Sequence, residues 1–483
     1  MKNKRISRRR FFGEASCAAL GSTALLSSVA NMKLWNALAV PTVGANEDYK
    51  ALVCILLAGG NDSYNMLIPR SGEAYTNYQN TRADLALSSN AVLPISPITS
   101  DGVDYGLHPS MSGLQSLFAD GNAALVANIG TLIEPIANRT EYYDRIKRRP
   151  LGLYSHSDQI QQWQTSVPQS RAAIGWGGRM ADILMDMNSN ENISMNISLS
   201  GRNVFQSGEL TMEYTISNEG NGADGIEPIS GYGNNGFLNR IRENAVNSLL
   251  EDVYSDIFKS TYANLKSDAL VAQEEFAAAI AKVPPFADKP NGDAAFGAHY
   301  LAQNLRMVAK TIGARQDLGM KRQTFFITFG GWDHHNEVLD NQLYMLGVVS
   351  DALKDFYDVL KNDLGIEQNV TAFTVSDFGR TLTSNGQGSD HAWGGNQIIV
   401  GGALNGREIY GQYPSLSLNE TDNPLNLSDR GALIPTTAVD QYFAEMALWF
   451  GVSPNDLSTI LPNIGNFYDI SSADMPIGFL NRP

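Results

Sequence analysis

The stretch ALVCILLAGGNDS, residues 51–63, decides how the fold begins. Its first eight residues form an unbroken apolar run, which ends in two glycines followed by Asn61, Asp62 and Ser63. A short apolar run bounded by glycine is typical of a strand that is buried on both faces of a parallel sheet. We therefore expect a strand at 51–58 with polar residues at its carboxyl end.

Similar apolar runs recur along the chain and alternate with helical patterns. Further strands are predicted at 123–129, 193–199, 323–329, 370–375 and 397–400, and helices at about 106–121, 155–166, 246–283, 295–315, 337–364 and 439–450. This alternation predicts an α/β fold, with a mostly parallel, doubly wound sheet and helices on both faces. We expect a single domain at 40–483, in which the Gly/Asn-rich residues 203–245 form an insertion.

The N-terminus has the layout of a twin-arginine export signal. A basic head contains RRRFF at residues 8–12, and a mildly apolar run follows at 17–30. Small residues at 37–39 suit cleavage before Val40, and an uncleaved anchor is the alternative. The run is too short for a membrane span. We expect a signal peptide at 1–39, export by the twin-arginine translocase, a periplasmic or secreted location, and no stable transmembrane segment in the mature chain.

Charge and cysteine content exclude several classes of protein. The chain carries a net charge of −15, and its first 39 residues hold seven Lys or Arg and one Glu, so the remainder carries −21. Such acidity argues against nucleic acid as a partner. The remainder retains one cysteine, Cys54, which excludes both an intramolecular disulfide and a cysteine-based zinc cluster.

Polar residues gather just past the predicted strand ends. Asp62, Asp333 and Asp377 each follow a strand, and parallel strands present their carboxyl ends at one ligand-binding edge. Asp390 lies in the loop after Asp377. Five of the six histidines lie in or beside such loops, namely His108, His156, His334, His335 and His391. Carboxylates and imidazoles at one edge suit a divalent cation: zinc, or manganese, magnesium or calcium with more oxygen ligands.

Each of these residues also has a structural interpretation. An aspartate after a strand, such as Asp62, often caps a helix or forms a turn. His108 lies at a predicted helix start, and His156 in the first turn of another. His334 and His335 are adjacent, so on an extended segment only one of them faces the site. The tripeptide DFG at 377–379 resembles that of protein kinases, but the other kinase motifs are absent, as is the GxSxG motif of serine hydrolases.

Several motifs together resemble a known family. They are LAGGNDSYNMLIP, GLHPSM, YSHSDQIQQW, FGGWDHH and SDFGRT…GSDHAWGG, which occur in this order after the leader. With them the chain resembles the exported bacterial family called "domain of unknown function 1501", over nearly the whole mature length. The fold of that family resembles those of alkaline phosphatases and sulfatases, which are metal-dependent hydrolases.

The resemblance implies a particular set of ligands. Asp333, His335 and His391 match the positions of one metal site, and Asp62 and Asp377 those of a second. This set leads us to expect a divalent metal cofactor, whose identity stays open among Zn, Mn, Mg and Ca.

The resemblance also implies catalytic residues. It places a nucleophile at a helix N-terminus, where Ser155 or Ser157 lies, with Ser63 as a further option. Such helix termini favour anions. Arg380 is expected to clamp the ester oxygens. One departure from the pattern is Phe378, which stands where the related enzymes have a histidine, and His108 or His156 is a candidate to replace that ligand.

The sequence thus predicts an exported metal-dependent hydrolase of phosphate or sulfate esters, acting on a small anionic ester. The alternative is a non-catalytic protein that binds or assembles an envelope component and keeps the fold, with or without one structural cation. The departure at Phe378 favours this alternative.

Overall fold

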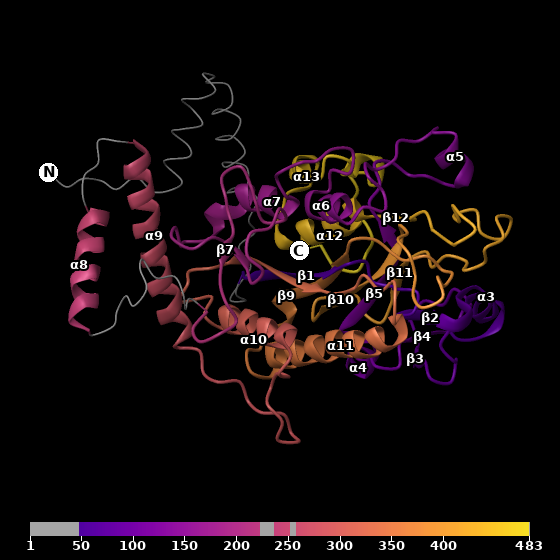
Figure 1. Cartoon of the computed structure of the whole chain (residues 1–483), viewed down its shortest axis with the longest axis horizontal. Helices are drawn as coiled ribbons and strands as arrows, with labels where there is room; N and C mark the ends of the chain where they lie inside the picture. The colour runs from indigo at the N-terminus through magenta and orange to yellow at the C-terminus, as the bar shows by residue number, and fades with distance from the viewer. Residues whose placement is uncertain (1–47, 223–235, 252–256, 483) are drawn as a thin grey trace.

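The computed structural model describes residues 48–222, 236–251 and 257–482. Its main strands are β1 Lys50–Ala58, β5 Ala123–Gly130, β6 Asn196–Ser198, β7 Tyr214–Thr215, β8 Arg322–Gly330, β9 Val370–Ser376, β10 Gly395–Gly401, β11 Ile409–Gly411 and β12 Thr437–Ala438. In this described part they form a nine-stranded sheet of order β11-β5-β10-β9-β1-β8-β6-β7, with β12 beside β5 (Figure 1). A small separate sheet contains β2 Leu67–Pro69, β3 Leu93–Ile95 and β4 Tyr105–Leu107.

The strand directions confirm a mixed α/β fold with a mostly parallel central sheet. Strand β1 pairs in parallel with both β8 and β9. Strand β10 is the exception, because it runs antiparallel to β9 and to β5. The loop between β9 and β10 therefore leaves and re-enters the sheet at the same edge, which is the carboxyl edge of β1, β8 and β9.

The helices pack on both faces of the sheet. Their bounds are α3 Gly72–Arg82, α4 Ser112–Ala119, α5 Arg139–Tyr143, α6 His156–Thr165, α7 Trp176–Leu184, α8 Phe237–Glu251, α9 Ile257–Ile280, α10 Tyr300–Gly313, α11 Val338–Asn362, α12 Val439–Phe450 and α13 Leu457–Ile460. Short 3-10 turns occupy Ala83–Leu85, Met185–Met187, Glu367–Asn369, Pro454–Asp456 and Ile464–Asn466. In Figure 1, α10 and α11 lie below the sheet while α6, α7 and α12 lie above it.

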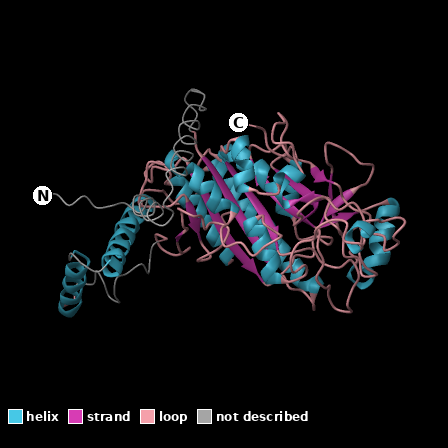
Figure 2. Cartoon of the chain, turned by 90° about the horizontal axis from the view of Figure 1, so that it is seen from above, coloured by secondary structure: helices cyan, strands magenta, loops and turns pink. Residues whose placement is uncertain are grey.

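Strand β1 shows why its sequence is apolar throughout. Successive side chains of a strand point to opposite faces. Val53 and Ile55 therefore join the core with α4, α10 and α11, whereas Cys54 and Leu56 join the core with α7 and α12. All four side chains are buried. Helices run along the strands when the sheet is seen from above (Figure 2).

Several boundaries differ from the sequence prediction. The strand predicted at 193–199 has only three residues, and β7, β11 and β12 are too short to show a hydrophobic period. The helix predicted at 246–283 is two helices, of which α8 begins inside the predicted insertion 203–245 and projects from the body (Figures 1 and 2). The predicted signal peptide lies outside the described residues. None of the helices in the described ranges combines the length and hydrophobicity that crossing a bilayer requires.

The C-terminal segment is held on α12 by one carboxylate, which allows a stability test. Buried Glu445 accepts hydrogen bonds from the backbone N–H groups of Ile477 (2.6 Å), Gly478 (2.8 Å) and Leu480 (2.6 Å). Because Glu445→Ala leaves these donors without an acceptor, we expect the free energy of unfolding in urea to fall by about 2–4 kcal/mol. Glu445→Gln, which keeps one oxygen, should lose less. Equal stability of Glu445→Ala and wild type would contradict this account.

Candidate metal centre

The loops after β1 and β8 touch at the carboxyl edge of the sheet. Gly59 has a positive φ of +123°, and a Cβ atom added there would lie 2.4 Å from the backbone nitrogen of Asp333. Only glycine permits both this conformation and this approach. The glycine at the end of β1 therefore lets the Asp333 loop close over the strand.

A cluster of three ligand-type side chains lies at this edge. His156 is the first residue of α6, Asp333 follows β8, and His391 lies in the loop between β9 and β10. One ligand atom from each residue lies within 4.8 Å of the others. Nε2 of His156 is 3.5 Å from Oδ2 of Asp333, and Nε2 of His391 is 3.4 Å from Oδ1. The side chains are 25–46% exposed, so a solute can reach the centre from solvent.

Hydrogen bonds on the far side of two rings set which nitrogen faces the centre. Nδ1 of His156 is 2.6 Å from the carboxylate of Asp377, and Nδ1 of His391 is 2.8 Å from the backbone carbonyl of Tyr154. Ionised carboxylates and carbonyls only accept, so Nδ1 of each ring carries the proton. In a neutral ring the lone pair is then on Nε2, which faces Asp333. Metal-binding histidines are held in this way.

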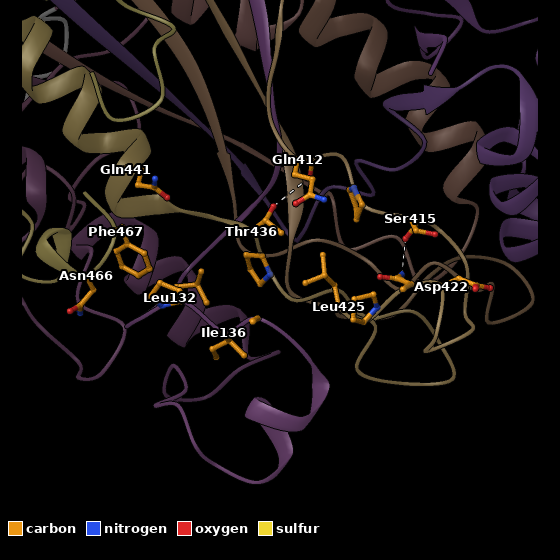
Figure 3. A pocket seen from close by; sticks show the side chains of 16 residues that line it. Leu132, Ile136, Gln412, Ser415, Asp422, Leu425, Thr436, Gln441, Asn466 and Phe467 are labelled. Atoms are coloured by element: carbon orange, nitrogen blue, oxygen red, sulfur yellow. Dashed lines mark hydrogen bonds between the residues drawn. The ribbon is translucent and has the colours of Figure 1, made fainter. Parts of the chain in front are cut away.

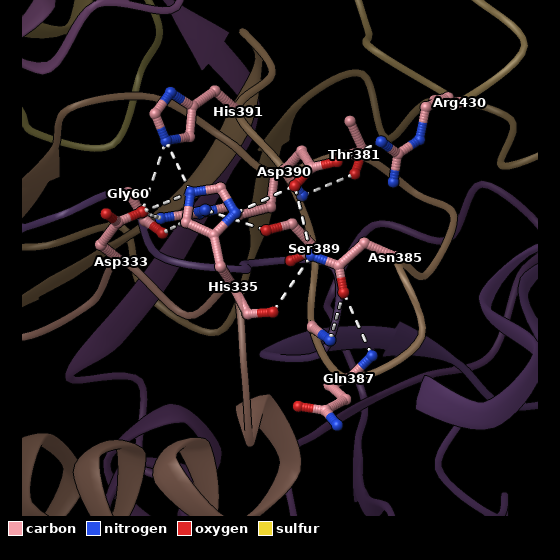
Figure 4. Close-up of polar contacts among 12 residues, drawn as sticks. Gly60, Asp333, His335, Thr381, Asn385, Gln387, Ser389, Asp390, His391 and Arg430 are labelled. Atoms are coloured by element: carbon pink, nitrogen blue, oxygen red, sulfur yellow. Dashed lines mark hydrogen bonds and ion pairs between the residues drawn. The ribbon is translucent and has the colours of Figure 1, made fainter.

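A third imidazole completes the cluster (Figure 4). Nε2 of His335 is 3.1 Å from Oδ1 of Asp333 and 3.0 Å from Nε2 of His391, and its Nδ1 is 2.9 Å from Asp390. Nitrogen and oxygen lone pairs therefore converge at close range, which suits a cation between them. A set of histidine nitrogens and one carboxylate fits zinc, whereas magnesium and calcium prefer oxygen ligands.

The electrostatic environment favours the metal-binding forms of two of these residues, His391 and Asp333. Burial, together with the charge of Arg380, lowers the pKa of His391, so that its ring is neutral at neutral pH. Burial acts to raise the pKa of Asp333, but the hydrogen bond and charge of Arg380 outweigh it and leave that pKa lowered. A neutral imidazole and an ionised carboxylate are the forms that bind a metal.

The structure does not bring Asp62 or Ser63 to this cluster. Asp62 is fully buried and forms an ion pair with Arg82 (2.6 Å), at the end of α3, and accepts a hydrogen bond from Ser389. Oγ of Ser63 is buried and accepts from the backbone N–H of Asn396. A second metal on Asp62 and Asp377 is not favoured by this geometry, because Asp62 has a buried cation of its own and Asp377 holds His156.

Two of the candidate histidines lie apart from the cluster. His108 is buried, its Nδ1 lies 2.8 Å from the Ser110 hydroxyl, and burial lowers its pKa to about 4. His334 is buried beside the Trp332 ring, with centroids 5.8 Å apart. Of this adjacent pair, His335 faces the centre and His334 does not.

Arg380 is buried beneath the centre. Its guanidinium donates to the carbonyls of Gly60 (2.8 Å), Ser389 (2.9 Å), Gly59 and Trp332, and pairs with Asp333. These bonds tie three loops together. Clamping of ester oxygens by Arg380 stays a prediction, and this placement does not favour it.

The remaining predicted residues surround the rings. Ser155 caps α6 by accepting from the backbone N–H of Asp158, and its hydroxyl lies 3.2 Å from that of Ser157, so a nucleophilic role for either serine stays a prediction. The Phe378 ring packs against His156 and His391, with centroids 4.8 and 4.6 Å apart. Phe378 therefore forms an apolar wall of the centre, and His156 supplies an imidazole beside it.

Sequence reasoning missed two participants. Tyr154 acts through its backbone carbonyl, which no side-chain pattern can reveal. Arg430 pairs with Asp390 across a long span of sequence, and nothing in its neighbourhood marks it as a site residue.

A pocket of about 620 Å³ lies elsewhere on the described part of the molecule (Figure 3). Two of its polar side chains form hydrogen bonds with the protein backbone. Gln441 accepts from the Ala438 N–H, and Asn466 donates to the Ile133 carbonyl. Its lining includes neither the three imidazoles nor Asp333. The imidazole cluster, not this pocket, is therefore the candidate functional site.

No curated protein matches the chain. Among solved structures it is similar to Ps i-CgsB in complex with k-i-k-neocarrahexaose, with 8% identity, a TM-score of 0.32, and 87% of this chain and 74% of that chain covered. It is also similar to the lipoteichoic acid synthase LtaP from Listeria monocytogenes, with 8% identity, a TM-score of 0.25, and 73% and 62% covered.

These TM-scores are low, so neither structure supports a function for this chain. The match to a family model covers most of the chain: the model of "Protein of unknown function (DUF1501)" matches residues 49–437. The chain belongs to this family.

Proposed function

We propose that this protein is a metal-dependent hydrolase of phosphate or sulfate esters with a single zinc centre. One observation carries the proposal: the Nε2 atoms of His156, His335 and His391 converge on the Asp333 carboxylate while other groups hold the far side of each ring. The side chains of the centre are 25–46% exposed, so water or an ester oxygen can reach the ion, where it would take a fifth position beside the four protein ligands.

The residues have separable tasks in this proposal. Asp333 and the imidazoles would hold the ion, and Asp377 and the Tyr154 carbonyl orient two of the rings. When bound, zinc would polarise an ester oxygen and lower the pKa of a water molecule. Ser157, exposed at the N-terminus of α6 beside His156, is the hydroxyl we propose for attack on the ester. The Phe378 ring excludes water from one side.

The proposal extends to the family-level expectations. We propose the doubly wound, alkaline-phosphatase-like variety of the α/β fold, and export through the twin-arginine route to the periplasm or beyond. Support for export comes from the RRRFF motif and the apolar run that follows it.

A non-catalytic binding protein is the second candidate. One observation favours it: the Ser157 hydroxyl lies 3.2 Å from that of Ser155, which itself accepts from the Asp158 backbone N–H, and neither contact supplies a base. In that case the zinc ion would hold loops together without turnover.

Metal content and turnover test the proposal together. Protein exported by its native route should contain about one zinc ion per chain by plasma mass spectrometry, and His156→Ala should contain much less, because a ligand is lost. Aryl phosphates and aryl sulfates should be hydrolysed by wild type and by the matched control His299→Asn, but not by His156→Ala. His299 suits as a control because it caps α10 and is not part of the cluster of ligand-type side chains, and asparagine is also a good N-cap. Zinc without turnover would select the binding protein, and absence of metal would refute the enzyme.

A further inference from the structure

Asp390 and Arg430 stand behind His335, on the side away from the metal centre (Figure 4). Oδ1 of Asp390 is 2.9 Å from Nδ1 of His335, and its other oxygen pairs with the Arg430 guanidinium. We propose that Asp390 and Arg430 are positioning residues that fix the His335 imidazole as a further ligand of the zinc ion. This inference rests on the proposed function for the ion, but the placement of the ring can be tested without it.

The reason lies in the two tautomers of a neutral imidazole. If Nε2 of His335 carried the proton, that proton would face Nε2 of His391 (3.0 Å) and Asp333 (3.1 Å), and the ring would have no lone pair for a cation. An acceptor at Nδ1 selects the other tautomer, in which the Nε2 lone pair faces the centre. Asp390 is that acceptor. Asn385, which donates to the same oxygen at 3.2 Å, helps to keep the carboxylate in place.

Arg430 is placed against Asp390 by its own backbone. The carbonyl of Arg430 accepts from Thr383 N–H (3.1 Å), and the carbonyl of Gly431 accepts from Leu382 N–H (3.2 Å). Gly431 has a φ of +78°, and an added Cβ would lie 2.6 Å from Leu382. The two segments therefore pair closely, which brings the Arg430 guanidinium to the Asp390 carboxylate. An ion pair at this point holds Asp390 toward His335.

If Asp390 and Arg430 position His335, replacing either residue should weaken zinc binding. Competition with a chromophoric chelator is expected to show a dissociation constant about 10–100-fold higher for Asp390→Ala. Asp390→Asn should lose less, because its amide oxygen still accepts from Nδ1–H. For Arg430→Met we expect a rise of about two- to fivefold, as for a partly exposed ion pair. Arg139→Met is the matched control, since Arg139 also forms an exposed pair, with Glu420, and should leave the zinc affinity unchanged.

Two spectroscopic signals separate positioning from general damage. Cobalt-substituted Asp390→Ala should have a weaker and shifted visible absorption band than cobalt-substituted wild type, because one imidazole is lost from the ion. In metal-free protein labelled with ¹⁵N-histidine, nuclear magnetic resonance should show His335 protonated at Nδ1 in wild type and in Arg139→Met, and a shift toward protonation at Nε2 in Asp390→Ala.

The outcomes are distinguishable from those of the proposed function. If wild type binds no zinc, the proposed function fails, and the His335 tautomer alone then decides the inference. If wild type binds zinc but Asp390→Ala binds it within twofold and keeps the wild-type tautomer, the positioning role is refuted. If Asp390→Ala does not fold, the same measurements on Asp390→Asn and Arg430→Met decide the positioning role.

Discussion

Replacing Asp333 by alanine is expected to weaken zinc binding by more than about 100-fold, beyond the loss caused by removing an orienting partner. Both oxygens of Asp333 face imidazole nitrogens, so this carboxylate would supply the negative charge that balances the proposed cation. Ester hydrolysis should fall to the rate without enzyme. Chelator competition and an aryl ester assay measure the two effects.

The control for this substitution is Asp333→Asn. Alanine also removes the charged partner of buried Arg380, whereas asparagine keeps an oxygen that accepts from it. Asp333→Asn should therefore unfold near the wild-type temperature and still bind zinc poorly. If it binds zinc as wild type does, Asp333 is not a ligand.

Replacing Arg380 by methionine should destabilise the protein by about 3–5 kcal/mol, because its donors satisfy carbonyls of three loops in a buried place. Urea unfolding followed by circular dichroism measures this loss. Arg430→Met, which breaks a partly exposed ion pair, should lose at most about 1 kcal/mol.

The same variant distinguishes two roles for Arg380. The sequence suggested a substrate clamp, in which case Arg380→Met would keep the wild-type stability and lose only activity. The structural role predicts instead that stability falls, with activity lost as a consequence. An unchanged urea midpoint together with a raised KM would restore the clamp.

The sequence was informative where patterns are local. The apolar runs of β1, β5 and β9 predicted their strands to within a residue or two, because burial on both faces requires apolar residues at every position. Polar residues after the strands marked the edge at which His156, Asp333 and His391 meet. Of the adjacent pair His334 and His335, only His335 faces this edge.

The sequence was uninformative where distant charges pair. Asp62 looked like the other aspartates after strands, and only the fold shows that Arg82 neutralises it. Asp377 and Asp390 were predicted as ligands or site residues, but both lie behind histidines. The hydrogen bonds that assign these roles join residues 221 and 55 positions apart, so no local pattern reveals them. Arg430 carried no local signal at all.

The reversed direction of β10 lowers the entropic cost of assembling one side of the candidate centre. Because β9 and β10 join at one edge, the hydrogen bond from Arg380 to Ser389 closes a span of 9 residues, whereas that between His156 and Asp377 closes 221. The cost of loop closure grows as the logarithm of length, so the longer span costs about 3 kcal/mol more. The side of the candidate centre that carries His391 thus belongs to a short local loop. His156 takes its place only when segments 221 residues apart have come together.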